Sequence, residues 1–240
     1  MVNRRPPPET VWDRPEPVHR PRPEPLSREQ IVRAAIVIAD AEGLDAVSLR
    51  GVGAALDAGP MRLYRFIATK EELLDLMVDD VFREISTDDL ARGKWRDALR
   101  TLAHRTRKAA HRHKWFVDLL GGRPHLGPHA LQSFEASLAA MSRAKGFADI
   151  DDALDAIKIF NAFVLGAIRN EASDSASGMD RASWQGATWP YIEKTLATGR
   201  FPMLARVVRD ARHRSSDDVF DEGIECVLDG IADRLAARKK

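Results

Sequence analysis

The sequence predicts an all-α protein. Apolar residues recur every three or four positions from residue 26 to the C-terminus, which is the period of an amphipathic helix. Residues typical of helix N-caps stand at the starts of several of these segments. No stretch alternates apolar and polar residues as a half-buried strand would, so we expect no sheet.

Residues 1–25 differ in composition from the rest of the chain. They hold eight of the 13 prolines and several charged residues, so we expect a disordered or polyproline-like tail. The alternative is an arm that inserts Arg20 and Arg22 into a DNA minor groove.

The first predicted helix begins after Ser27 and ends at Gly43. Ser27 and Gln30 are spaced as a capping box, and glycine is the usual residue in the left-handed position after a helix. The apolar spacing of Ile31, Ala35 and Ile38 gives this helix one buried face.

Two short helices and one long helix follow. Ser48 caps the second helix, and the "DAG" sequence at 57–59 predicts a tight turn. Gly59 and Pro60 begin a third short helix, because proline is favoured at the first helical position. Leu63 and Ile67 should point inward. Thr69 and Glu72 form a second capping box at the start of a long helix that reaches Ile85.

The rest of the chain also has helical periodicity. The predicted helices cover 95–119 (one or two helices), 128–145, 150–171, 181–198, 202–213 and 217–237. Glycine and proline make 121–130 a loop, and "SDSASGMD" at 173–180 is predicted to be a second loop.

Composition excludes several classes of protein. The net charge is +1, so any affinity for nucleic acid must come from a local patch. The single cysteine, Cys226, excludes an intramolecular disulfide framework and suits the cytoplasm. No apolar run has the length of a membrane span, and the N-terminus lacks the pattern of a secretory signal.

An enzyme is the competing class. The "GVGAAL" sequence at 51–56 begins like a dinucleotide-binding fingerprint, but it lacks the third glycine and a preceding strand. We also find no phosphate-binding loop, nucleophile elbow or paired carboxylates, and therefore predict no catalytic residues and no cofactor.

Two neighbouring segments have opposite charge. Residues 71–90 are acidic and residues 91–114 are basic. We favour a solvated helix face balanced by the acidic helix before it over a second nucleic-acid site or a site for an anionic ligand.

A short helix, a turn and a third helix with cations and aromatic residues indicate a helix-turn-helix. The "EGL.A.SLR" and "MRLYRF..TKEELL" patterns, within about sixty residues without an obvious gap, resemble the N-terminal domain of the TetR family of transcriptional repressors. The resemblance implies a DNA-binding domain over 26–86, with the helix-turn-helix at about 48–67, and a double-stranded, palindromic operator. Asp57, where the family usually has glycine, and Phe66, where it commonly has histidine or tyrosine, depart from its pattern.

The family resemblance also implies roles for individual residues. Phosphate contacts fall to Ser48, Tyr64 and Lys70, while Arg50 and Arg62 are candidates for base contacts. Phe66 either packs against a thymine methyl or is a partly buried packing residue. Pro60, Met61 and Arg65 complete the predicted DNA-binding site, although Arg65 also fits a solvated surface charge.

Residues 95–235 resemble, more weakly, the regulatory domain of the tetracycline-repressor subgroup, in segments such as "FVLGAIRNEA" and "VFDEGIECVLDGIADRL". This implies a helical domain over 90–240 for a small-molecule effector and for homodimerisation, joined to the DNA-binding domain by the long helix. Pocket candidates are Leu102, His104, Thr106, Trp115, Phe116, Leu119, Phe134, Leu138, Asn161 and Val164. Dimer-interface candidates are Leu154, Ile157, Val164, Phe220, Ile224, Val227 and Ile231. The alternative is that both sets face the core of one subunit.

The five histidines from His104 to His129 raise the question of a metal-binding site. His111 and His113 point to opposite sides of a helix, and no His-x-x-x-His or Glu-x-x-His pair accompanies them. We therefore predict no metal site.

Overall fold

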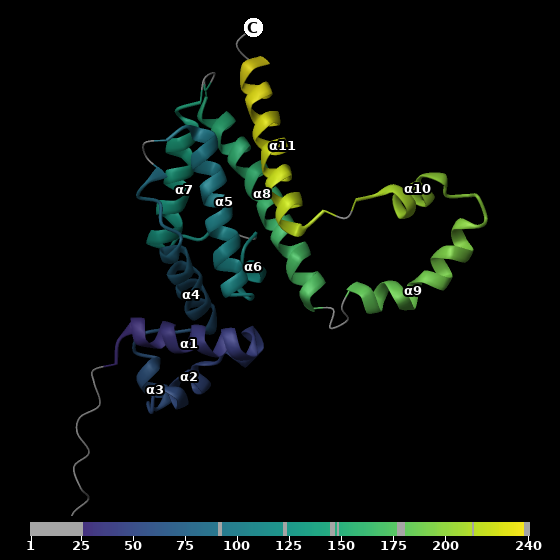
Figure 1. Cartoon of the computed structure of the whole chain (residues 1–240). Coiled ribbons are helices and arrows are strands. Elements are labelled where there is room, and N and C mark those ends of the chain that lie inside the picture. The colour runs from purple at the N-terminus through teal and green to yellow at the C-terminus, as the bar shows by residue number, and fades with distance from the viewer. Residues whose placement is uncertain are drawn as a thin grey trace, which may run out of the picture.

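A computed structural model describes residues 26–90, 93–121, 124–144, 147, 149–176, 181–212 and 214–237. All regular elements in these ranges are helices, which confirms the predicted class. The N-terminal tail, with Arg20 and Arg22, lies outside the described residues. We call the group of α1, α2 and α3 the head; it lies at one end of the molecule (Figure 1).

The helices that build the head and the connector begin close to the predicted positions. Their bounds are α1 (Arg28–Glu42), the 3-10 helix η1 (Leu44–Ala46), α2 (Leu49–Ala55), α3 (Pro60–Leu63) and α4 (Lys70–Glu84). The Ser27 capping box is present in full, with both reciprocal hydrogen bonds made. At Thr69 it is incomplete, because the Glu72 carboxylate accepts from the Ala68 amide instead of the Thr69 amide.

Seven further helices follow in the described part of the chain. Their bounds are α5 (Trp95–Arg112), α6 (Phe116–Leu119), α7 (Pro128–Met141), α8 (Ile150–Ala176), α9 (Arg181–Leu196), α10 (Pro202–Asp210) and α11 (Ser216–Ala237). The segment 95–119 is therefore two helices. The loop predicted at 173–180 is wrong in its first part, because α8 continues to Ala176.

We call the part formed by α4–α8 and α11 the body; α4 joins it to the head (Figure 1). One hydrophobic core extends through both, from Ile31 in α1 to Leu235 in α11. Met77 and Val81 in α4 are fully buried within it, so this connector packs along its length and is not a free linker.

The pairing of α8 with α11 buries most of the predicted dimer-interface residues within one subunit. Five of the seven candidates, namely Ile157, Val164, Phe220, Ile224 and Ile231, are at most 5% exposed within a single subunit. Leu154 and Val227 are half-buried. This burial within a single subunit favours the alternative that the apolar stripes of the two helices face the core of their own chain.

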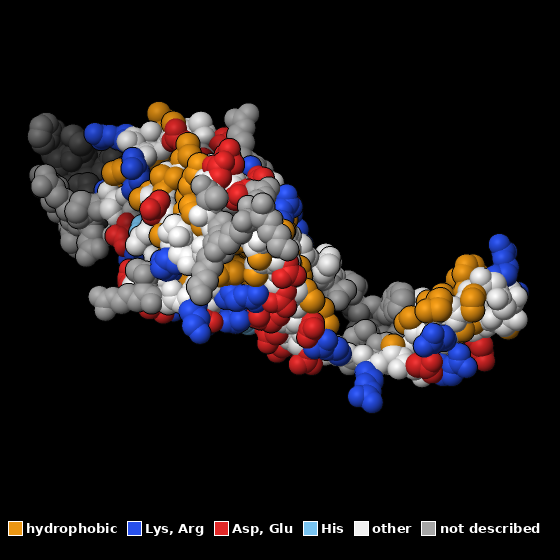
Figure 2. Space-filling model, turned by 90° about the horizontal axis from the view of Figure 1, so that it is seen from above, with side chains coloured by type: hydrophobic (Ala, Val, Ile, Leu, Met, Phe, Trp, Pro, Cys, Tyr) orange, Lys and Arg blue, Asp and Glu red, His pale blue; other side chains and the backbone are white. Residues whose placement is uncertain are grey.

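We call α9 and α10 the arm; they extend away from the body between α8 and α11 (Figure 1). Seven of its large hydrophobic side chains are exposed: Trp189, Tyr191, Phe201, Met203, Leu204, Val207 and Val208. Figure 2 shows hydrophobic side chains gathered on this part of the surface. Such an apolar patch, held away from the core, is typical of a surface that another molecule covers.

Several basic side chains of α5 form ion pairs with acidic residues of α11, which the sequence did not indicate. Arg105 and Arg112 do pair with the preceding acidic segment, through Asp89 and Glu84. Other residues of α5, spaced three or four positions apart, face acids spaced four apart on α11: Arg96–Asp229, Arg100–Glu225, His104–Asp221 and Arg107–Asp217. We call this set the α5–α11 ion-pair ladder. The prediction that the preceding acidic segment balances α5 is thus correct only in part.

Within the described residues, no helix combines the length and apolar character needed to cross a membrane.

Candidate DNA-binding and regulatory sites

The helix-turn-helix is built by local sequence effects. The Ser48 hydroxyl accepts a 3.0 Å hydrogen bond from the Gly51 amide and caps α2. Asp57 adopts a φ of 49° in the turn, a conformation that aspartate tolerates better than most residues. Gly53 is required for close packing, because a Cβ atom there would lie 2.7 Å from the Ala58 carbonyl oxygen. These features bring α3 against α2.

The third helix is short and well anchored. Gly59 and Pro60 begin it as predicted, and it ends at Leu63, so Tyr64, Arg65 and Phe66 lie in the following turns. Leu63 and Ile67 are buried, which confirms their predicted inward orientation. The chain between them is tied by hydrogen bonds from the Phe66 and Ile67 amides to the Leu63 carbonyl.

Most of the predicted DNA-binding residues are open to solvent. Tyr64 is 51% exposed and Met61 79% exposed. Ser48, Arg50, Pro60, Arg65 and Lys70 are exposed, and Arg62 is half-buried. In the described part of the chain, the structure shows no ion pair that involves Arg50, Arg62 or Arg65. These guanidinium groups therefore carry positive charge that no neighbouring carboxylate neutralises directly.

Lys70 lies at the first position of α4, next to the Thr69 cap. Its ammonium group donates to the Leu44 carbonyl oxygen at 3.4 Å. That hydrogen bond is long, and the side chain is exposed. A helix N-terminus with an adjacent cation attracts a phosphate group.

Phe66 belongs in part to the core. Its side chain is half-buried and packs against buried residues of the head. Its carbonyl oxygen accepts from the Arg28 guanidinium at 3.4 Å. This geometry favours the packing interpretation of Phe66, and leaves only its exposed part available to a thymine methyl.

The ten pocket candidates differ in their exposure. Leu102, Trp115, Phe116 and Val164 are buried, whereas Thr106, Leu119 and Leu138 are half-buried. His104, Phe134 and Asn161 are exposed in the single subunit. A surface cavity of about 300 Å³ lies between α5 and α11, and it includes His104 alone among the candidates.

That cavity is lined mainly by charged side chains that sequence reasoning missed. They are Arg100, Arg214, Asp218, Asp221, Glu222 and Glu225, beside His104 and Ile224. The hydrogen bond from Arg100 lowers the pKa of the Glu225 carboxyl and raises the pKa of Arg100. The four-residue spacing on both helices was visible in the sequence, but their adjacency was not.

The histidines of the body pair with carboxylates. His111 contacts Glu171 at 2.8 Å, and His129 contacts Asp79 at 2.9 Å. In the described ranges, no three histidine, cysteine or acidic side chains come together as a metal ion would require.

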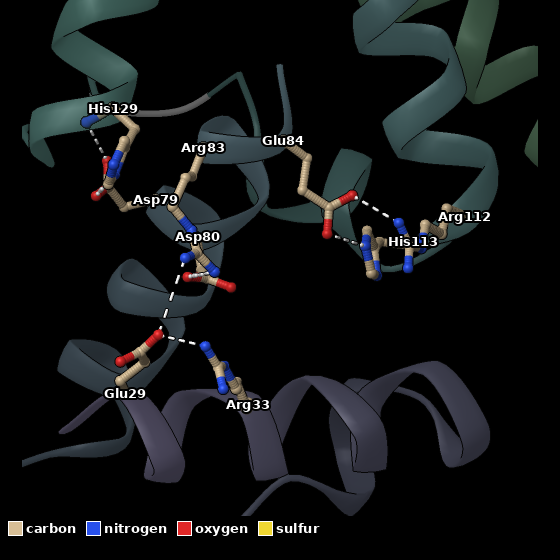
Figure 3. Close-up of polar contacts among 9 residues, drawn as sticks. All are labelled: Glu29, Arg33, Asp79, Asp80, Arg83, Glu84, Arg112, His113 and His129. Carbon is tan, nitrogen blue, oxygen red and sulfur yellow. Dashed lines mark hydrogen bonds and ion pairs between the residues drawn. The ribbon is translucent and has the colours of Figure 1, made fainter. Parts of the chain in front are cut away.

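Asp79 joins the connector helix to α7, as Figure 3 shows for its contact with His129. Asp79 is 9% exposed, and its carboxylate accepts hydrogen bonds from the His129 amide at 2.9 Å and the Ala130 amide at 3.0 Å. These amides belong to the first turn of α7, whose own N-cap residue, Gly127, has no side chain. An acid on α4 therefore caps α7.

His113 and Trp115, in the turn between α5 and α6, contact the head. The Trp115 indole N–H donates to the Asp40 carboxylate at 2.7 Å, and His113 Nδ1 lies 2.9 Å from the same group. Glu84, at the end of α4, contacts His113 Nε2 at 3.4 Å and Arg112 at 3.2 Å (Figure 3). Sequence reasoning placed Trp115 in a pocket and did not single out Asp40.

Comparison with known proteins relates the whole chain to transcriptional regulators. Residues 88–235 match the family model described as "Tetracyclin repressor-like, C-terminal domain". The HTH-type transcriptional repressor DrrR1 of Streptomyces coeruleorubidus is 37% identical over 237 residues, which cover 96% of this chain and 86% of that protein. The class A tetracycline repressor from transposon 1721 in Escherichia coli is 26% identical over 87% of this chain and 92% of its own length.

Solved structures have the same fold. Apo ActR from Streptomyces coelicolor has a TM-score of 0.76 at 25% identity, over 89% of this chain and 98% of its own. ActR in complex with actinorhodin has a TM-score of 0.75 at 26% identity, over 87% of this chain and 96% of its own.

Proposed function

The chain belongs to the TetR family of transcriptional repressors, and from that premise we propose that it is a homodimeric, ligand-responsive repressor. Its head would bind a double-stranded operator, and a small molecule bound in the body would release it. The main support for DNA binding is the exposed surface of the helix-turn-helix. Among the described residues, no carboxylate forms an ion pair with its Arg50, Arg62 or Arg65 side chain. Free cations of this kind bind phosphates and base edges.

Homodimerisation follows from the geometry of operator recognition. Two recognition helices must reach half-sites about 34–36 Å apart, which one head cannot do. We propose that the outward faces of α8 and α11 and the apolar arm meet a second copy. Ile159 in α8 and Val219 in α11 are about half exposed and would take part in this contact.

Release would depend on movement of α4. This helix runs from Lys70, at the DNA surface, to Glu84, where it contacts the turn before α6. A ligand that alters the packing of the body would displace α4 and change the distance between the heads. A coupling of about 1–3 kcal/mol lowers operator affinity by roughly 5- to 150-fold.

DNA binding is tested by a mobility-shift assay with the DNA that flanks the chain's own gene. The wild type should bind with an affinity that falls steeply as salt rises, because phosphate contacts release counterions. The Arg62→Ala/Lys70→Ala variant should lose most of this binding. Lys94→Ala is the control, since it removes an exposed cation at the N-cap of α5, at the end of that helix farther from the head. Absence of any specific shift with the wild type would refute the proposal.

Effector binding is tested by thermal shift, with ligands named for the relatives as the first probes. Actinorhodin, (S)-DNPA and minocycline occur in the related ligand-bound structures, and tetracycline names the related repressors. A genuine effector must raise the unfolding temperature and also release the operator. A ligand that binds at saturation without affecting operator binding would not be the effector.

An enzyme on a helical scaffold and a ligand-binding protein without DNA affinity are the alternatives. The named relatives are transcriptional regulators, and we propose that this chain likewise acts in the cytoplasm without a catalytic reaction. Both alternatives predict no operator complex, so the mobility-shift assay separates them from a repressor.

A further inference from the structure

The head is attached to the body at a second place besides α4. There, the Asp40 carboxylate in α1 accepts from the indole N–H of Trp115 and from His113 Nδ1. Because an ionised carboxylate can only accept hydrogen bonds, Nδ1 of His113 carries the proton. We call Asp40, His113 and Trp115 the latch.

The donor side of the latch is buried. The His113 side chain is 4% exposed and Trp115 is 4% exposed, whereas the Asp40 side chain remains 32% exposed. If the head moved away, both N–H groups would lose a carboxylate acceptor. Hydrogen bonds to a charged group contribute more stability than neutral ones, so the latch opposes such movement.

Both ends of the segment that follows α5 are held. At its start, Glu84 contacts His113 and Arg112. At its end, the Arg169 guanidinium of α8 donates to the carbonyl oxygens of Val117 and Leu120. The helix α6 lies between these points, so the latch connects α1 of the head, through α6, to α8 of the body.

The packing of α4 already limits movement of the head, and the latch adds a second constraint on its angle. In a dimer, the angle of each head relative to its body determines where the recognition surfaces lie on the DNA. A shift of one base pair between half-sites changes their separation by about 3.4 Å and their relative rotation by roughly 35°. Heads that are held tightly cannot follow such a change without breaking contacts.

We infer that Asp40 is a positioning residue, and that the latch sets the selectivity of the repressor for one spacing between operator half-sites. Asp40 need not touch DNA to do this. The inference rests on the proposed binding of a palindromic operator by a dimer.

The test compares wild type and Asp40→Asn on operators whose half-sites are separated by the natural distance or by one base pair more or fewer. The wild type should prefer the natural spacing by about tenfold or more, the size expected when one or more base contacts are lost. Asp40→Asn should reduce this preference to about threefold or less. Binding to DNA with a single half-site should be the same for both proteins.

The control is Glu42→Gln, which removes an exposed carboxylate near the same end of α1 and should keep the wild-type preference. If Asp40→Asn loses half-site binding because the head is damaged, Trp115→Phe decides, since it removes a latch donor and leaves the head unchanged. An unchanged spacing preference in a variant that binds the half-site normally would overturn the inference. Failure of the wild type to bind any operator would instead refute the proposed function.

Discussion

Gly127 shows how a single residue can be determined by a distant side chain. A Cβ atom at this position would lie 2.2 Å from Oδ1 of Asp79, the acid that caps α7 from α4. The backbone amides of α7 can approach the carboxylate only because residue 127 has no side chain. The glycine is thus explained by a close approach and not by a positive φ.

We expect Gly127→Ala to reduce the free energy of unfolding by about 1–3 kcal/mol, the usual cost of forcing extra atoms into a packed site. Urea denaturation measures this value. Gly186→Ala is the control, because a Cβ atom there meets nothing within 4 Å and alanine is the better helix former. Equal stability of both variants would contradict the steric explanation.

The cations of the DNA-binding surface should differ in effect, because some contact bases and others contact phosphates. Arg62→Ala should relax the preference at one or two base pairs and cost roughly 1–3 kcal/mol at those sites. A binding profile over a randomised operator measures this. An unchanged sequence profile would remove Arg62 from the base-reading residues.

Lys70→Ala should weaken binding by a similar factor at every operator variant. It should also reduce the slope of log affinity against log salt by about 1, because one phosphate contact is lost. Salt titration of the mobility shift measures the slope, and Lys94→Ala provides the matched control. A normal slope in Lys70→Ala would mean that its ammonium group contacts no phosphate.

At the scale of elements, α5 and α11 are joined by charge as well as by apolar contact. The α5–α11 ion-pair ladder repeats along both helices, and Arg107 also lies over the ring of Phe220 at 4.7 Å. The ladder lies largely at the surface, where an isolated pair contributes little and a network contributes more. It therefore sets how the two helices align more than it sets total stability.

The Arg100–Glu225 pair should make stability depend on acid. Hydrogen bonding from Arg100 lowers the pKa of Glu225 below its ordinary value of 4.5. The stabilisation is thus present above about pH 4.5 and is lost as the pH falls through the lowered pKa. Glu225→Gln should cost under about 1 kcal/mol at pH 7, because the pair is partly exposed, and should cost less as the pH falls below 4.5. Thermal unfolding at pH 7 and at pH 3 checks this; an equal loss at pH 3 would exclude a charge effect.

At the scale of the whole molecule, the arm is the part of the subunit whose apolar side chains are least covered by its own chain. Its helices contact each other and present apolar side chains to solvent, while the body has a continuous core. Burial against a second subunit would remove that apolar area from water. The exposed apolar surface of the arm thus favours association with a second subunit.

We expect Val207→Asp, at a valine in α10 that is 52% exposed, to weaken the dimer by at least about tenfold in dissociation constant, or roughly 1.4 kcal/mol. Sedimentation at several concentrations measures the shift to monomer. Val37→Asp changes an equally small side chain on α1 that is 66% exposed, and should leave the dimer intact. A wild-type dimer in Val207→Asp would exclude this face of the arm from the interface.

Local sequence patterns predicted the features of the fold that depend on neighbouring residues. The helical class, the Ser27 and Ser48 caps, the turn at Asp57 and the start of α3 at Pro60 depend on residues within a few positions of one another. Apolar spacing also identified which side chains of the head are buried, such as Leu63 and Ile67, because a helix has a fixed period.

What that spacing could not show is which partner an apolar face meets. Phe220 and Ile224 have the same pattern whether they face their own core or a second subunit, and only the packing of α8 on α11 assigned them to the core. For the same reason a list of core residues and a list of pocket residues looked alike, and His104 and Phe134 proved to be exposed.

The sequence by itself thus determined the helices, their caps and the presence of a helix-turn-helix, because these depend on short-range geometry. Only the tertiary structure decided that Asp40 joins Trp115, that Asp79 caps α7 and that Arg100 pairs with Glu225. These contacts join residues 50 to 125 positions apart. The periodicity of a single helix indicates which residues share a face, and the packing of helices against one another decides what that face touches.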